Sequence, residues 1–304
     1  MRPPPSPTKC LRYPVTTSIA VLAVAATVQS WIVYIDPVFL SDTGNCLREP
    51  WRLLTPALFH GGPLHLIFNV CWLWAFGTLV EKRFGHVAAL GICLLLAVGS
   101  VAAELALFRC GLGLSGVVYG LFGLLWVLSR TDPRLEDAVD EKVVELMIGW
   151  FILCVVLKVA DVWNIALVSH AAGCILGALL GWTISADKLS YRLGRSTILV
   201  ATFLLCLAGA TVARQKVNLV EDWVGSNSAE DGRIAWEHGN TEEAIRRYQD
   251  AVRANPNVYP WWLSLGAAYE QAGRKDEARD ARNRAAALRR HGPSKSAARG
   301  GDFP

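Results

Sequence analysis

Residues 111–120 read GLGLSGVVYG and place Ser115 at the start of an apolar stretch that continues as LFGLLWVL. A serine hydroxyl becomes a useful nucleophile when a base accepts its proton, and imidazole suits that task near neutral pH. A histidine, His170, stands in a second apolar stretch that reads SHAAGCILGALLG. Gly113 and Gly116 flank the serine and would let the backbone bend sharply there. These residue types make Ser115 and His170 a candidate nucleophile and base.

Both stretches carry glycines at four-residue intervals. They are Gly116 and Gly120 after the serine, and Gly173, Gly177 and Gly181 after the histidine. Small residues with this spacing form a helix face that allows close packing in a membrane. If the two faces pack together, Ser115 and His170 come to a similar depth. We therefore expect their side chains to lie within reach of each other.

A third polar element is HGGPLHLIFN, residues 60–69. His65 and Asn69 are one helical turn apart and face the same way, and both can donate hydrogen bonds. Acyl transfer requires donors aimed at the developing oxyanion, which an amide and an imidazole N–H can supply. Each residue also has a purely structural explanation, such as helix packing or an interhelical hydrogen bond. Their shared depth on one side of the membrane favours a functional site.

The composition indicates an all-α membrane protein. Of 304 residues, 53% are hydrophobic and 18% are charged, below the roughly 25% usual for soluble domains. Apolar runs near 20 residues are long enough to span the hydrocarbon as helices. We expect seven spans, at 15–35, 64–80, 86–108, 115–129, 143–160, 165–184 and 196–213.

The distribution of positive charge predicts the orientation. With the N-terminus in the cytoplasm, eleven Lys and Arg fall in inner segments and three in outer loops before the seventh span. We therefore expect a multi-pass protein of the plasma or inner membrane, with the C-terminal tail outside. Arg214 and Lys216, just beyond the last span, argue against an outer tail. The first run resembles a signal peptide in its basic start, but its length and the later spans favour a retained helix.

The cysteines do not suggest a disulfide framework. Of the eight cysteines, five lie within expected spans: Cys71, Cys93, Cys154, Cys174 and Cys206. Cys46 and Cys110 would both face outward, so a bridge between them is an open alternative. His60 and His65 are two possible metal ligands, but no H-E-x-x-H motif is present, which argues against a zinc protease. No metal or cofactor is implied.

The expected domains are a Pro-rich tail (1–14), a six-span core (15–185), a connector with a seventh span (186–213), and a soluble tail (214–304). A shift of 34 residues aligns small residues within about 228–290: Gly232 with Gly266, Gly239 with Gly273, Ala244 with Ala278, and Ala251 with Ala285. With Trp262, Leu265, Gly266 and Tyr269, the tail resembles two tetratricopeptide repeats. Such a module binds a peptide or protein partner or acts as a spacer, and both readings stay open.

The membrane segment resembles the rhomboid family of intramembrane serine proteases. The resemblance rests on WR at 51–52, HGGPLHLIFN at 60–69, VEKRFG at 80–85, GLSGVVYG at 113–120 and HAAGCILG at 170–177. It implies that Ser115 is the nucleophile and His170 the base of a dyad without an aspartate. It also implies an oxyanion hole formed by His65, Asn69 and the backbone N–H of Ser115.

Further positions follow from the same resemblance. The ring of Tyr119 would pack against His170, and Gly113, Gly116 and His60 would support the site. Trp51 and Arg52 belong to an outer-loop motif with a structural role. Leu114 departs from the family, because many members carry alanine there, and this substitution would narrow the pocket beside the nucleophile.

The implied function is cleavage of transmembrane helices in membrane-protein substrates near the outer face. One alternative is a catalytically silent relative that binds and escorts transmembrane helices, although such a protein would not need Ser115, His170 and Asn69 together. Another is a transporter, which would tend to show repeated halves and buried charge pairs that these spans lack. No feature suggests binding to nucleic acid.

Overall fold

The computed structural model describes residues 4–33, 50–108, 111–160, 162–163, 165–217, 219 and 225–290. These residues form helices, with no strands among them. The chain divides into two compact units, Met1–Val217 and Asn218–Pro304, and each is considered by itself. Cys46 and Cys110 lie outside the described residues, so the bridge between them stays a hypothesis.

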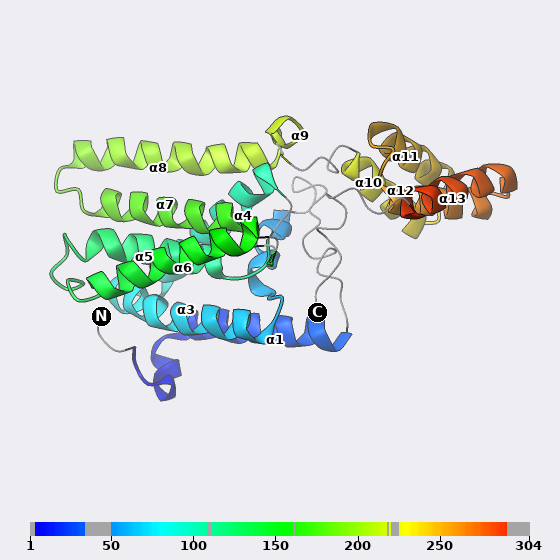
Figure 1. The fold of residues 1–304 in the computed structure, drawn as a ribbon. Helices are drawn as coiled ribbons and strands as arrows, with labels where there is room; N and C mark the ends of the chain where they lie inside the picture. Colours follow the sequence, from blue (N-terminus) through cyan, green and yellow to red (C-terminus); the bar gives the residue numbers. More distant parts are fainter. Residues whose placement is uncertain are drawn as a thin grey trace. The chain divides into compact units, whose positions relative to one another are not determined.

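The first unit is a bundle of long helices whose axes run roughly along one direction (Figure 1). They are α1 (Pro14–Val33), α3 (Pro63–Phe84), α4 (His86–Leu107), α5 (Ser115–Leu128), α6 (Glu141–Val159), α7 (Leu167–Ile184) and α8 (Leu189–Ala210). Shorter pieces are η1 (Pro7–Arg12), η2 (Pro50–Leu53), η3 (Thr55–Leu58) and α9 (Arg214–Val217). Each of the seven segments expected to span the membrane therefore overlaps one of these long helices.

Five of these helices are long and apolar enough to cross a membrane: α1, α3, α4, α7 and α8. The apolar helix α5 is shorter, with 14 residues, and it lies in the hydrophobic core of the unit with nearly all its residues buried. Neighbouring helices shield α5 from lipid. The non-helical backbone next to this short helix is tolerated at membrane depth because protein surrounds it. Helix α6 is not among the five, and it carries charges such as Glu145 and Lys158.

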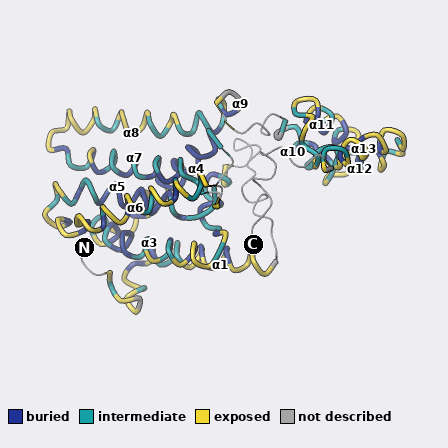
Figure 2. Tube along the Cα trace, viewed as in Figure 1, coloured by how far each residue is buried: buried dark blue, intermediate teal, exposed yellow. Residues whose placement is uncertain are grey.

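Helix α8 begins earlier than the sequence suggested, at Leu189 rather than residue 196. Two basic residues of the expected connector, Arg192 and Arg195, lie within this helix and bond to carbonyls near the end of α7. Arg192 donates to Ala186 O at 3.1 Å, and Arg195 donates to Trp182 O at 2.6 Å. Figure 2 shows many exposed positions along α8, as expected for a helix whose outer face contacts lipid.

The N-terminal tail is more ordered than its Pro-rich composition suggested. Tyr13 is buried, and Trp74 Nε1 donates to Pro5 O at 2.7 Å. The carboxylate of Glu81 accepts the N–H groups of Val15 and Thr16, both at 2.9 Å. Glu81 therefore caps the N-terminus of α1 from the end of α3.

The second unit consists of two antiparallel helix pairs. They are formed by α10 (Ser226–Glu237) with α11 (Thr241–Ala254), and α12 (Tyr259–Gln271) with α13 (Lys275–Arg290). The turns use Gly239 and Gly273, with φ of 73° and 76°, where glycine is favoured. A Cβ on Gly232 would lie 3.0 Å from the Tyr248 ring, so the small residue permits close pairing. The repeat expected from the 34-residue shift is confirmed as tandem helix pairs.

Candidate active site

Ser115 is the first residue of α5 and is half-buried. The turn before it depends on Gly113, whose φ of 111° is a conformation that favours glycine. Two hydrogen bonds hold this turn: Gly113 N–H donates to Pro56 O at 3.0 Å, and Leu114 N–H donates to His60 Nε2 at 3.3 Å. The candidate nucleophile therefore follows a fixed, non-helical segment.

The glycine faces of α5 and α7 pack directly against each other. A Cβ added to Gly173 would overlap the Gly116 carbonyl oxygen, and one added to Gly177 would overlap the Gly120 carbonyl oxygen. One turn further, a Cβ on Gly181 would lie 3.0 Å from Leu124 O. The close packing that the glycine spacing predicted is therefore present, in a regular register along both helices.

This register brings the surroundings of Ser115 and His170 together. A Cβ on Gly116, the residue after the serine, would lie 2.5 Å from the Oγ of Ser169, the residue before the histidine. Ser115 and His170 therefore lie near the N-terminal ends of α5 and α7, at the same level of the bundle. The expectation of a shared depth agrees with this packing.

His170 is 5% exposed and belongs to a cluster of three rings with Tyr119 and Phe151. Its ring centroid is 4.8 Å from that of Tyr119 and 6.4 Å from that of Phe151. The Tyr119 hydroxyl donates to Met147 O on α6 at 3.0 Å, which fixes the phenol ring. Within the described part of the chain His170 Nδ1 has no hydrogen-bond partner, so the Ser115 hydroxyl does not donate to this nitrogen.

The two candidate oxyanion donors lie at the start of α3. A Cβ on Gly113 would be 2.9 Å from His65 Nε2, so the His65 ring lies against the turn that leads into Ser115. Asn69 is 2% exposed, and its Nδ2 donates to His65 O at 2.9 Å. This bond uses one amide hydrogen and leaves the second N–H of Asn69 for another acceptor.

His60 supports the turn before Ser115. Because Nε2 accepts the Leu114 N–H, Nδ1 carries the proton and donates to Thr27 Oγ1 at 3.2 Å. Thr27 in turn donates to Leu58 O at 3.1 Å. Burial, with a smaller contribution from nearby His65, lowers the pKa of His60 to about 3, so the imidazole stays neutral. A neutral ring keeps its acceptor available to Leu114.

The remaining predicted positions lie in η2, outside this cluster. Trp51 is 55% exposed, as expected for a side chain at the membrane interface, and Arg52 is half-buried next to it. The described residues contain no group of three or more His, Cys, Asp or Glu side chains arranged to hold a metal.

Sequence reasoning missed two contacts near the base. Phe151 forms one side of the His170 environment, and nothing in its sequence position indicates this. Glu104 is 2% exposed, and its Oε2 accepts the Ser169 N–H at 2.9 Å. The sequence does show Glu104 as an acidic residue inside an apolar run. An acidic residue in a membrane helix is energetically costly and by default points to function.

Models of two known protein families match parts of the chain. A model of the rhomboid domain matches residues 47–187, a range that contains every candidate site residue above. Residues 47–187 are a rhomboid domain. A tetratricopeptide repeat model matches residues 230–300, which include most of α10 and all of α11, α12 and α13. Helix α8 lies beyond the matched rhomboid domain.

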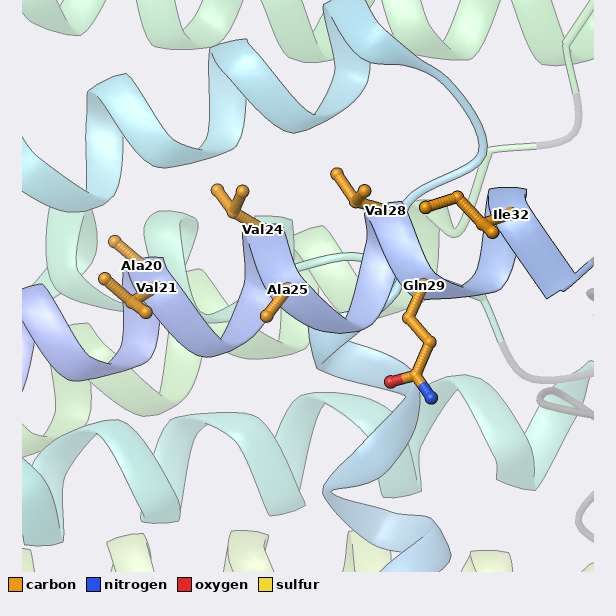
Figure 3. A pocket seen from close by; sticks show the side chains of 7 residues that line it. All are labelled: Ala20, Val21, Val24, Ala25, Val28, Gln29 and Ile32. Atoms are coloured by element: carbon orange, nitrogen blue, oxygen red, sulfur yellow. The ribbon is translucent and has the colours of Figure 1, made fainter.

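An apolar hollow of about 560 Å³ lies along the outward face of α1 (Figure 3). Its lining residues all come from that helix: Ala20, Val21, Val24, Ala25, Val28, Gln29 and Ile32. The hollow contains none of the candidate site residues, and its apolar lining is typical of a face that contacts lipid.

Proposed function

We propose that the rhomboid domain is an intramembrane serine endopeptidase in which Ser115 is the nucleophile and His170 the general base. The observation that carries the proposal is the glycine contact of α5 with α7, which aligns the helix ends that bear the two residues. Most rhomboid proteins are serine intramembrane proteases, which agrees with this assignment.

The reaction would proceed through an acyl-enzyme. Ser115 Oγ attacks the scissile carbonyl carbon while His170 takes the hydroxyl proton. His65, Asn69 and the Ser115 N–H stabilise the negative charge on the carbonyl oxygen. As the peptide C–N bond breaks, His170 gives the proton to the departing amine. His170 then removes a proton from water, and the resulting attack releases the acid and restores Ser115.

The substrate would be a transmembrane helix of another membrane protein. Its carbonyls are engaged in i to i−4 hydrogen bonds, so the segment must unwind before attack. Glycine or other small residues near the scissile bond lower the cost of unwinding. With the N-terminus in the cytoplasm, the end of the bundle that bears Ser115 lies near the outer face, where water is available. The tetratricopeptide module would lie on the same side and recruit a peptide or protein.

The experiment is labelling of the purified protein in detergent by a fluorophosphonate probe. We expect labelling of the wild type and its loss in Ser115→Ala and His170→Ala. Ser129→Ala is the matched control, because Ser129 lies at the opposite end of α5 and its hydroxyl donates to Trp126 O. Equal labelling of Ser115→Ala would identify a different nucleophile. Absence of labelling in folded wild-type protein would favour the silent, helix-binding alternative.

A further inference from the structure

Glu104 lies in the last turn of α4 and is almost completely buried, with 2% exposure. Its Oε2 accepts the N–H of Ser169, the third residue of α7, at 2.9 Å. A carboxylate buried at membrane depth is costly unless it is well hydrogen-bonded. The contact with Ser169 at the start of α7 supplies such a bond.

Helix α7 has no cap of its own. Ala166 occupies the N-cap position, and no side-chain hydrogen bond is made there. The first N–H groups of a helix lack intrahelical acceptors, and a side-chain oxygen normally accepts one of them at the second or third position. Val168 and Ser169 occupy those positions in α7. Glu104 therefore replaces the missing cap from a different helix.

His170 follows directly after these two residues. Its N–H donates to Ala166 O at 3.3 Å, so it takes part in the first helical turn. If that turn opened, the ring of His170 would move with it. The loop before α7 is held separately by Lys158, whose Nζ donates to Ile165 O at 2.7 Å.

We propose that Glu104 is a positioning residue for His170: by capping the first turn of α7, it sets the height and rotation of the general base. The inference rests on the proposed function. It assigns to Glu104 no contact with the substrate and no proton transfer.

The chain contains a matched case for comparison. Glu81 is also 2% exposed and caps α1 through Val15 and Thr16, but α1 carries neither candidate of the dyad. Both glutamates thus cap the start of another helix, and Glu81 also accepts from Thr16 Oγ1 and contacts His86 Nδ1, both at 2.7 Å. Only the cap on α7 precedes His170.

The test uses Glu104→Leu and Glu104→Gln beside Glu81→Leu and Glu81→Gln in the full-length protein. Leucine has no acceptor, whereas the glutamine carbonyl oxygen still accepts an N–H at the same reach. Saturation kinetics of fluorophosphonate labelling give a maximal rate and a half-saturating concentration. Hydrogen exchange read by mass spectrometry reports the opening of residues 167–170 and of residues 14–17 without requiring activity.

We expect Glu104→Leu to lower the maximal labelling rate on the order of 10–100-fold with little change in half-saturation, since small misplacements have effects of this size. Exchange should quicken at 167–170. Glu104→Gln should recover most of the rate. Glu81→Leu should quicken exchange at 14–17 and lower the labelling rate less than Glu104→Leu does.

Unchanged exchange at 167–170 in Glu104→Leu would overturn the proposed cap. A wild-type labelling rate in that variant would overturn the positioning role, and so would an equal loss of rate in Glu81→Leu. If Glu104→Leu does not fold, Glu104→Asp replaces it. Its carboxylate is one methylene shorter, so it should label more slowly than Glu104→Gln, and the reverse order would overturn the proposal. A wild-type protein that does not label contradicts the protease function itself, while exchange still decides whether Glu104 caps α7.

Discussion

Gly116 and Gly173 meet backbone to backbone, with the Gly116 carbonyl oxygen occupying the space where a side chain on Gly173 would begin. Because the contact involves main chain on one side, no rotamer change can relieve an added methyl group. The same relationship recurs between Gly120 and Gly177. The separation of α5 and α7, and with it the relation of Ser115 to His170, therefore depends on hydrogen atoms at these positions.

Gly173→Ala should separate the two helices and lower the free energy of unfolding by about 1–3 kcal/mol, the usual cost of overpacking. Fluorophosphonate labelling should fall as well, because the base moves away from the serine. Gly149→Ala on α6 is the control, since a Cβ there meets nothing within 4 Å. It should be neutral, or stabilising by up to about 1 kcal/mol through helix propensity. Equal thermal unfolding midpoints for the two variants would contradict this explanation.

Tyr119 combines two contacts that substitution can separate. Tyr119→Phe removes the hydrogen bond to Met147 O but keeps the ring beside His170. We expect a loss of about 1 kcal/mol in unfolding free energy, the usual net value of one hydrogen bond, with labelling largely retained. Tyr119→Leu also removes the ring and should slow labelling clearly. If Tyr119→Phe slows labelling as much as Tyr119→Leu, the hydroxyl rather than the ring supports the base.

The sequence predicted the parts of the site that depend on local periodicity. The four-residue glycine spacing indicated the α5–α7 contact. The separation of His65 and Asn69 by one helical turn placed both on one face of α3. Bonds between distant residues left no such pattern. Glu104 and Ser169 are 65 positions apart, and His60 and Leu114 are 54 apart.

Helix ends were also harder to predict than helix centres. Hydropathy placed the start of the seventh span at residue 196, but α8 begins at Leu189. In the added stretch Arg192 and Arg195 bond to carbonyls near the end of α7. The charges that lowered the hydropathy of this segment are the groups that stabilise it. A hydropathy criterion cannot detect that compensation, because it depends on where α7 ends.

The positive-inside distribution predicts that the tetratricopeptide unit lies on the outer side. In sealed vesicles with the outer face exposed, added protease should digest the C-terminal unit without lysis. The N-terminal tail should be digested only after lysis. An epitope tag at each end gives the readout within a single preparation. Digestion of the C-terminal unit only after lysis would contradict the proposed orientation.

His60 should make stability depend on pH. The folded state holds its pKa near 3, mainly through burial, against 6.5 for the free side chain. Between these values the unfolded chain binds a proton that the folded chain does not, so the free energy of unfolding decreases as pH falls. The slope from this group is up to about 1.4 kcal/mol per pH unit, with full stability retained above pH 6.5.

His60→Gln tests this dependence, because the glutamine carbonyl oxygen can accept the Leu114 N–H that His60 Nε2 accepts but does not titrate. Thermal unfolding midpoints of the two proteins should converge as pH falls from 7 toward 4, with a shallower decline in the variant. The other buried histidines are present in both proteins, so their contribution is shared. Parallel declines would mean that His60 is protonated in the folded protein over this range, and the neutral tautomer that supports the turn before Ser115 would then be wrong.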